Sequence, residues 1–260
     1  VSIAYCPERV LPGNIISELV NNDRIIGGLD ARSTDIIASF YDTFIDGKVI
    51  KSSATTAEIC KLAENSFRDV NIAFANELSK ICETHDIDIW DLIELANHHP
   101  RVNILQPGIG VGGHCVAVDP WFLVSSDPKN ARIIRVAREI NDSKPEWVID
   151  KIMSRVKFLI AKGVIKPKVA CLGLTFKPNI DDLRGSPAVT VVHGLAKLGV
   201  DLVVVEPNIN SHNDFYLHSF EDAFEADLIV LLVKHREFLG NAEKEKLLNA
   251  KALDFCGALV

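Results

Sequence analysis

Cys115 stands two residues after the end of a glycine-rich segment, and it is the residue of this sequence that most clearly offers nucleophilic chemistry. A carboxylate, Asp119, stands four residues further on. A thiol attacks as its thiolate, so a catalytic cysteine needs a lowered pKa or an adjacent stabilising group. Three interpretations stay open: a buried small hydrophobe, which is the usual fate of a free cysteine; a metal ligand, which the cysteine spacing hardly supports; and a nucleophile.

The glycine-rich segment itself, GIGVGG over 108–113, satisfies the dinucleotide pattern G-x-G-x-x-G. That pattern binds a dinucleotide only where a strand precedes it and a helix opens on it, so that phosphate meets the helix N-terminus. Here Pro107 precedes the segment and His114 follows it. We therefore predict a loop whose glycines let the backbone approach a ligand or re-aim Cys115.

Lys61, Asn65 and Arg68 are spaced at i, i+4 and i+7, so on a helix they share one stripe. A solvated polar face is one interpretation. The other is that an amide aligned with two cations holds an anion, or stabilises an oxyanion that forms nearby.

Two loop segments are dense in charge: HHPR over 98–101 and FKPNIDDLR over 176–184. The second follows the apolar run 168–175, so it lies at the carboxyl end of a predicted parallel strand, where open α/β sheets bind ligands. A solvated turn is the alternative. The cations Lys177 and Arg184 at this edge favour phosphate contact.

The first part of the chain alternates strand and helix signals. Strands are predicted over 1–5, 24–30 and 48–53, with a helix over 31–44. A long helix is expected from a capping box, Thr55-x-x-Glu58, to about residue 85. One side of it is mostly apolar: Ile59, Ala63, Phe67, Val70, Phe74, Glu77 and Ile81. A second helix is expected over 87–97.

Further helices are predicted over 129–141, 145–162, 188–198 and 221–226, and buried parallel strands over 168–175, 201–207 and 227–234, with a last strand at 252–255. The fold class is therefore α/β: a partial α/β segment (1–52), a central helical domain (53–162), and a C-terminal Rossmann-like, doubly wound parallel sheet (163–260).

Composition narrows the function classes. The 260 residues carry 28 Lys+Arg and 35 Asp+Glu, a formal charge of −7, which argues against nucleic acid or an anionic membrane as the main partner. The six scattered cysteines form no CxxC pair, which indicates a reduced cytoplasmic protein without structural zinc. Apolar runs fall short of the ~20 residues of a membrane helix. The start within a strand suggests a piece of a longer chain.

Five blocks occur in an order and spacing that resembles the UDP-glucose/GDP-mannose dehydrogenase family: CPERVLPG (6–13), TAEICKLAENSFRDVNIAFANEL (56–78), HPRVNILQPGIGVGGHC (99–115), VDPWF (118–122) and LTFKPNIDDLRGSPA (174–188). Within that family, HPRVNILQPG and VDPWF resemble the branch that oxidises UDP-N-acetyl-D-mannosamine more than the UDP-glucose branch. The resemblance implies an N-terminal Rossmann domain that binds NAD, a central domain that forms a homodimer, and a C-terminal domain that binds the UDP-sugar. This chain lacks most of the first domain, since no strand–GxGxxG–helix fingerprint occurs.

The family's chemistry assigns roles by motif position. Cys115 would form a thiohemiacetal and then a thioester, Lys61 would be the acid/base or oxyanion partner, Asn65 an oxyanion donor, and Asp119 a base or water-positioning group. The sugar site would contain Arg9, Val10, Lys61, Asn65, Arg68, His99, Arg101 and Gly112, with Arg101 serving the neighbouring subunit. Phe176 and Lys177 would hold the uridine diphosphate and Arg184 would reach NAD; Gly185 departs from the Glu usual there.

The resemblance thus implies an NAD-dependent oxidation that supplies a uronic acid for surface polysaccharide. Two alternatives remain open at this stage. One is a dehydrogenase for UDP-N-acetylglucosamine or UDP-glucose, and the other is a non-catalytic dimeric module that binds nucleotide sugars.

Overall fold

The computed structural model of this protein describes residues 1–10 and 14–260; Leu11, Pro12 and Gly13, which end the first of the five sequence blocks, lie outside the described residues. The chain forms two compact units, Val1–Phe67 and Arg68–Val260. The boundary falls inside one long helix, α3.

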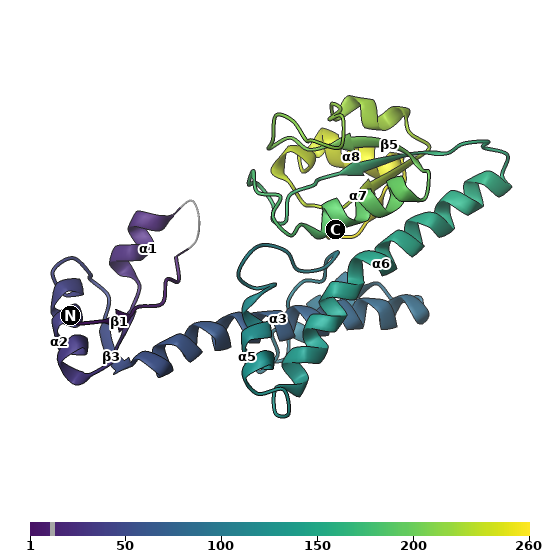
Figure 1. The fold of residues 1–260 in the computed structure, drawn as a ribbon. Helices are drawn as coiled ribbons and strands as arrows, with labels where there is room; N and C mark the ends of the chain where they lie inside the picture. The colour runs from purple at the N-terminus through teal and green to yellow at the C-terminus, as the bar shows by residue number, and fades with distance from the viewer. Residues whose placement is uncertain (11–13) are drawn as a thin grey trace. The chain divides into compact units, whose positions relative to one another are not determined.

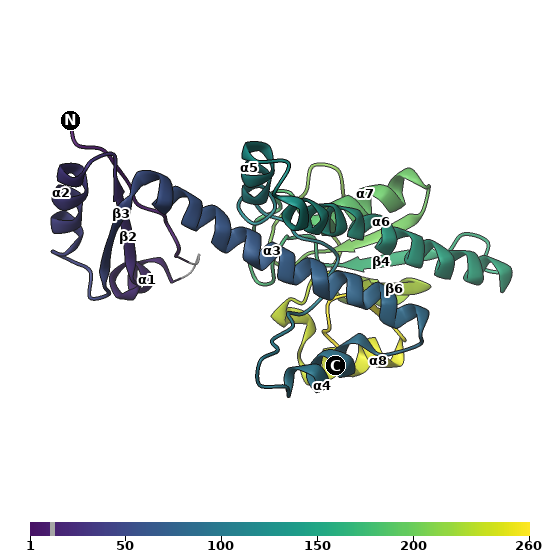
Figure 2. The ribbon, with the colours of Figure 1, turned by 90° about the horizontal axis from the view of Figure 1, so that it is seen from below.

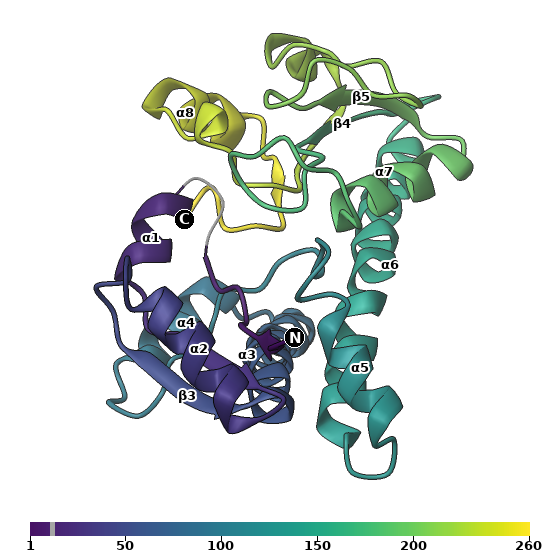
Figure 3. The same ribbon diagram turned by 60° about the vertical axis from the view of Figure 1, so that its left-hand side comes forward.

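The first unit contains a three-stranded sheet in the order β1 (Ala4–Tyr5), β2 (Arg24–Gly28), β3 (Val49–Ser53). β2 and β3 are parallel, whereas β1 pairs antiparallel with β2. Helix α2 (Ala31–Tyr41) connects β2 to β3, lies against the sheet (Figure 3), and begins where the Asp30 carboxylate accepts the Ser33 N–H at 2.6 Å. The three strands and α2 confirm the predicted pattern. The short helix α1 (Ile15–Asn21) was not predicted.

Helix α3 (Ala54–Thr84) has almost the predicted bounds but a different cap. The predicted capping residue, Thr55, is wrong, because Ser53 Oγ accepts the Thr56 N–H at 3.1 Å and the helix begins one residue earlier. The apolar stripe of the sequence is also largely exposed in the single chain, with Phe67 72% and Phe74 51% exposed. The opposite face is buried, and it is made of small and polar residues: Ala57, Ser66, Asp69, Ala73 and Asn76.

Three more helices complete the helical part: α4 (Ile89–Asn97), α5 (Asp119–Ser126) and α6 (Arg132–Ala161). α5 was not predicted. α6 replaces the two helices expected over 129–141 and 145–162, and it continues through Pro145 as one long helix (Figure 1). A proline costs a helix one hydrogen bond. Here the cost is offset because residues on both sides of Pro145, from Ala137 to Val156, share one buried face.

The C-terminal sheet has the order β5 (Asp201–Val205), β4 (Lys168–Leu172), β6 (Leu228–Leu231), β7 (Leu253–Asp254), and all its strands are parallel. Figure 2 shows helices α7 (Pro187–Lys197) and α8 (Asn241–Asn249) on opposite sides of β4 and β6, as the doubly wound prediction requires. The predicted helix over 221–226 is a 3₁₀ turn, η1 (Glu221–Glu225). A second 3₁₀ turn, η2 (Arg236–Phe238), and α8 were not predicted.

Each face of this sheet has its own apolar core. One joins α6 and α7 to the sheet, with Val148, Ile152, Val191 and Leu195 fully buried; the other lies under η1, η2 and α8, with Ala223, Phe238 and Leu247. Burial of such side chains stabilises by roughly 1.5–3 kcal/mol each. The sheet edge that carries the loops after β4, β5 and β6 is thereby held rigid from both sides. In the part of the chain that the structure describes, no helix is long and apolar enough to cross a membrane.

Candidate active site

The glycine-rich segment packs tightly onto the loop that follows β4, and this contact explains Gly112 and Gly113. A Cβ on Gly112 would lie 2.7 Å from the Phe176 Cβ and 2.6 Å from the Gly185 carbonyl oxygen. Gly113 has a φ of +86°, and a Cβ there would lie 2.9 Å from the Phe176 ring. These two glycines need no bound dinucleotide to explain them, because they let the backbone of residues 112–113 come close to the loop that carries Phe176 and Gly185. The predicted loop is confirmed.

Cys115 stands two residues after this contact and is half-buried, with a free thiol. Its backbone carbonyl accepts the N–H groups of Val118 at 2.9 Å and Asp119 at 2.8 Å. This turn fixes Cys115 immediately before α5 and places Asp119 in the first turn of that helix. The thiol is thus presented by a backbone held at both ends.

The Arg184 guanidinium lies close to Cys115. Its Nε and Nη2 atoms donate to the Asp182 carboxylate at 3.0 and 2.6 Å, and the two groups shift each other's titration: the pKa of Asp182 is lowered and that of Arg184 raised. Charge on Cys115 adds a smaller upward effect to the pKa of Arg184. The guanidinium is mostly exposed, so an anionic ligand can reach it.

The loop from Thr175 to Ser186 is closed on itself, since the Phe176 N–H donates to the Asp182 carbonyl at 3.2 Å. Phe176 is half-buried and Lys177 is exposed. Gly185 has a φ of +58°, a conformation that favours glycine. The residue that departs from the family pattern is therefore one that this backbone accommodates without strain.

A second group of predicted residues gathers in the first unit. Lys61 Nζ donates to the Glu8 carbonyl at 2.6 Å, and Arg9 Nη1 forms an ion pair with Glu64 at 2.8 Å. These contacts dock the 7–10 segment onto the first turns of α3, so residues more than 50 positions apart in sequence become neighbours. Val10 follows Arg9, and Asn65 lies one helical turn after Lys61.

The remaining predicted residues are less closely tied to these groups. Arg68 is exposed on α3. His99 and Arg101 lie on an exposed turn after α4, where the Arg101 N–H donates to His99 Nδ1 at 3.3 Å. For these two residues the described hydrogen bonds stay within their own turn.

A network of buried polar side chains, which was not predicted from the sequence, holds the glycine-rich loop. Asn76 Oδ1 accepts the Gly108 N–H at 2.9 Å, and its Nδ2 donates to Asn141 Oδ1 at 2.9 Å. Asn141 in turn donates to Asp69 at 2.8 Å, and Asp69 forms a buried ion pair with Arg138 at 2.6 Å. Side chains of α3 and α6 thus fix the start of the loop that ends at Cys115. The only sequence signal was a polar run on the face of α3 opposite its apolar stripe.

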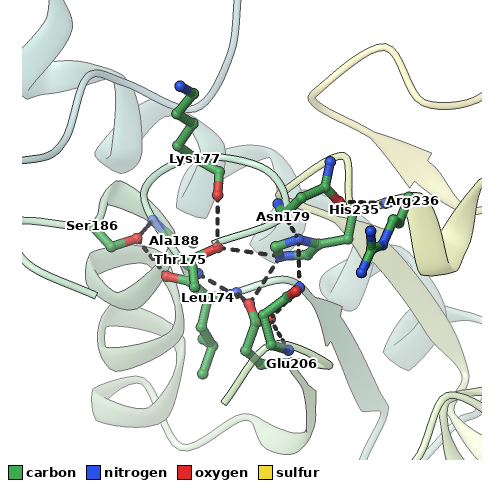
Figure 4. A network of polar contacts seen from close by, with 10 residues as sticks. Leu174, Thr175, Lys177, Asn179, Ser186, Ala188, Glu206, His235 and Arg236 are labelled. Atoms are coloured by element: carbon green, nitrogen blue, oxygen red, sulfur yellow. Dashed lines mark hydrogen bonds and ion pairs between the residues drawn. The ribbon is translucent and has the colours of Figure 1, made fainter. Parts of the chain in front are cut away.

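A second missed network underlies the loop after β4 (Figure 4). Glu206 follows β5, His235 lies shortly after β6, and both are buried. Glu206 accepts the Leu174 N–H at 2.6 Å and contacts His235 Nε2 at 3.0 Å. Burial alone would raise the pKa of Glu206, but these and the Asn208 N–H bond lower it overall. The sequence could have predicted this network, because Glu206 and His235 lie at the ends of two predicted parallel strands, and such ends meet at one edge of the sheet.

The described residues contain no group of three or more His, Cys, Asp or Glu side chains that could hold a metal ion. The metal-ligand interpretation of Cys115 therefore gains no support from the geometry. Its buried-hydrophobe interpretation also fits poorly, since Cys171, with a pKa raised to about 12 by burial, shows what a fully buried thiol of this chain looks like.

Comparison with known sequences matches nearly the whole chain to one family. Residues 55–143 match the central domain of the UDP-glucose/GDP-mannose dehydrogenase family, residues 170–258 its UDP binding domain, and residues 1–45 its NAD binding domain. The chain belongs to the UDP-glucose/GDP-mannose dehydrogenase family. The resemblance carried by the sequence blocks is thereby confirmed.

Individual members of this family are similar over most of the chain. UDP-N-acetyl-D-mannosamine dehydrogenase of Campylobacter jejuni is 50% identical over 98% of this chain and 62% of its own length. NDP-N-acetyl-D-galactosaminuronic acid dehydrogenase of Ralstonia solanacearum is 52% identical over 92% of this chain and 56% of its own length. A solved structure, the UDP-D-ManNAc dehydrogenase of Pyrococcus horikoshii, is 36% identical with a TM-score of 0.88, over all of this chain and 62% of the other. The chain spans about three fifths of the curated relatives it matches.

The family's cofactor, NAD, fits this chain in part. The parallel pair β2 and β3, connected by α2, is the kind of unit from which dinucleotide-binding sheets are built. The 108–113 segment does not supply the phosphate-binding turn, because Gly110, Gly112 and Gly113 are packed against Phe176, Gly185 and Pro187. Within the first unit, the residues that would face NAD are those of the β2–α2–β3 segment.

Proposed function

We propose that this chain is the substrate-binding and nucleophile-bearing part of an NAD-dependent dehydrogenase that oxidises C6 of a UDP-sugar to a carboxylate. The observation that carries the proposal is the contact between two loops: the one that presents Cys115 is packed on the one that presents Phe176 and Lys177. A thiol and a nucleotide-binding edge are thus parts of one rigid arrangement.

Oxidation of an alcohol to an acid removes two hydrides, each of which bound NAD accepts. The Cys115 thiolate adds to the aldehyde carbon after the first oxidation, and the resulting thiohemiacetal stays attached while the cofactor is exchanged. Loss of the second hydride leaves a thioester, which water cleaves to the carboxylate and the free thiol. Covalent attachment explains why a four-electron oxidation needs a cysteine.

The other roles follow from charge and position. Lys61 and Asn65 stabilise the oxyanion, with Lys61 moving the alcohol proton, and Asp119 orients the attacking water. Arg9, Val10, Arg68, His99, Arg101 and Gly112 contact the sugar, while Phe176 and Lys177 hold the uridine diphosphate. Arg184 reaches the cofactor.

The proposed sugar is N-acetyl-D-mannosamine, which the names of several similar proteins support. An N-acetylgalactosamine-type substrate is the second candidate, because a relative bearing such a name is 52% identical. The product in either case is a uronic acid suited to surface polysaccharide.

We also propose three domains, 1–52, 53–162 and 163–260, and a homodimer formed through the central one. The exposed apolar stripe of α3, with Phe67, Phe74 and Ile81, supports the dimer, because apolar stripes of this length are normally covered. A cytoplasmic location is proposed because all six cysteines are free, as expected in a reducing compartment.

Two measurements test this function. Calorimetry of the chain with UDP-N-acetylmannosamine, UDP-N-acetylglucosamine, UDP-glucose and NAD is expected to show binding of the first sugar above the others. In a preparation reconstituted with the complete NAD domain, Cys115→Ser and Cys115→Ala are expected to abolish acid formation while UDP-sugar binding persists. The variant Cys82→Ala, at a free thiol in the last turns of α3, is the matched control. Acid produced by Cys115→Ala would overturn the nucleophile assignment.

A further inference from the structure

We propose that His235 is a positioning residue for the nucleotide: its Nδ1 atom holds the loop of residues 175–184 in the conformation that presents Phe176 and Lys177. This inference rests on the proposed UDP-binding role of that loop. It concerns a residue that touches no ligand and acts only through the backbone.

The hydrogen bonds of His235 define which ring nitrogen carries the proton. The Asn179 backbone N–H lies 3.0 Å from Nδ1, and a backbone N–H can only donate. Nδ1 is therefore an acceptor and Nε2 carries the hydrogen. Nε2 faces the Glu206 carboxylate at 3.0 Å and Thr175 Oγ1 at 3.3 Å, and both can accept, because the Thr175 hydroxyl hydrogen is directed to the Lys177 carbonyl at 3.0 Å. The Asn208 amide Nδ2 also lies 2.9 Å from Nδ1 and donates to it, so every contact of the ring agrees with one neutral tautomer.

The residue that His235 holds has a left-handed backbone conformation, which asparagine tolerates better than most non-glycine residues do. Asn179 has a φ of +61°, in the left-handed region that non-glycine residues seldom occupy. Two hydrogen bonds keep it there: its N–H to His235, and its Oδ1, which accepts the Arg236 N–H at 2.8 Å. His235 and Arg236, which follow β6, thus hold Asn179 through two hydrogen bonds.

These hydrogen bonds also affect Lys177, whose side chain lies on the side of the loop that would face the nucleotide. Figure 4 shows the Lys177 carbonyl turned toward Thr175, while its ammonium points away from the network. Residues 177 and 179 are therefore anchored through their backbones to a fully buried histidine and a buried threonine. Loss of the anchor leaves the Lys177 side chain intact but frees the backbone that aims it, so binding pays the entropy of ordering.

The test compares two substitutions of His235 in the full chain, with UDP as the probe and calorimetry as the readout. Asparagine places its amide oxygen near the Nδ1 position and can still accept the Asn179 N–H. Glutamine reaches the Nε2 position and leaves that N–H without its acceptor. We expect UDP affinity within about threefold of wild type for His235→Asn and at least about tenfold weaker for His235→Gln, the effect of one lost hydrogen bond. His218→Gln, at a partly exposed histidine, is the matched control and should bind normally.

A double-mutant cycle separates positioning from general damage. If His235 acts through Lys177, His235→Gln should weaken binding much less in a Lys177→Ala background than in wild type. Additive effects, or equal affinities of the Asn and Gln variants, would overturn the inference. Should His235→Gln not fold, Thr175→Val removes the bond to the Lys177 carbonyl and is expected to weaken UDP binding by about threefold or more. Failure of the wild-type chain to bind UDP would instead contradict the proposed function, and the inference with it.

Discussion

The backbone N–H of Gly113 donates to the carbonyl oxygen of Arg184 at 3.1 Å. This single bond ties the loop that carries Cys115 to the loop that carries Phe176 and Lys177. The two loops come from different parts of the chain, one before α5 and the other after β4. Their mutual arrangement therefore depends on packing between them, and the first two predictions below concern the contacts that hold the loop before Cys115 in place.

Gly113→Ala is expected to destabilise the fold and disturb the thiol. The φ of +86° costs an alanine about 1–2 kcal/mol, and its Cβ would press on the Phe176 ring. Gly199→Ala is the matched control, since that glycine has a φ of +77° with nothing within 4 Å. Urea unfolding should show a larger loss for Gly113→Ala, together with a changed alkylation rate at Cys115. Equal losses in the two variants would show that the Phe176 contact contributes nothing.

Asn76→Ala should loosen the glycine-rich loop from the other end. It leaves the Gly108 N–H and Asn141 Oδ1 without their bonds to Asn76, at a cost of about 1–3 kcal/mol per buried group. Hydrogen exchange at Gly108, read by NMR, is expected to speed up. Unchanged protection there would mean that Asn76 does not hold the loop.

Lys144 makes stability depend on pH. Burial lowers the pKa of this lysine to about 7, although its ammonium lies 3.7 Å from the Trp147 ring centre, a contact that favours the charged form. Between pH 7 and the unfolded value near 10.5 the unfolded state binds more protons, so the stability contribution is lost as pH falls through this window. In the wild type, the free energy of unfolding should rise with pH by up to about 1.4 kcal/mol per pH unit in this window, and Lys144→Met should remove this rise.

Chemical unfolding between pH 7 and 9 measures this difference. Lys151→Met is the control, because Lys151 contacts the same tryptophan from a partly exposed position. Parallel pH profiles of wild type and Lys144→Met would contradict the assigned shift.

Phe74→Glu should disrupt the proposed homodimer. A charge at the centre of the apolar stripe of α3 would be desolvated in the interface, which costs several kcal/mol. Ile165→Glu changes an apolar residue that is 96% exposed in a loop, and it should leave association unchanged. Sedimentation velocity is expected to give a monomer for the first variant and a dimer for the second. A dimer that survives Phe74→Glu would place the interface elsewhere.

Several features of the fold were predictable because they are local. The apolar runs that became β4, β5 and β6 predicted a parallel sheet, and the rule that ligands bind at carboxyl ends of strands singled out the loop with Lys177. The glycine pattern before Cys115 correctly indicated a loop, because Pro107 and His114 exclude the strand and helix that a dinucleotide site requires.

Other features depended on contacts that local pattern does not encode. Pro145 predicted a helix break, but a shared buried face keeps α6 continuous. The apolar stripe with Phe74 was visible in the sequence, but the face of α3 that is buried carries Asp69 and Asn76, whose polar groups find partners on α6. Periodicity gives the faces of a helix, but which face is covered depends on the partners available.

The amino-acid sequence by itself determined the family, the order of the strands, and the residue types that carry the proposed chemistry, because each depends on short-range spacing. Only the tertiary structure decided that Gly113 meets Arg184, that Asn76 holds Gly108, and that His235 accepts the Asn179 N–H. Those contacts join residues between 32 and 71 positions apart, and buried polar groups must find partners wherever packing brings them. Their geometry follows from the packed interior as a whole.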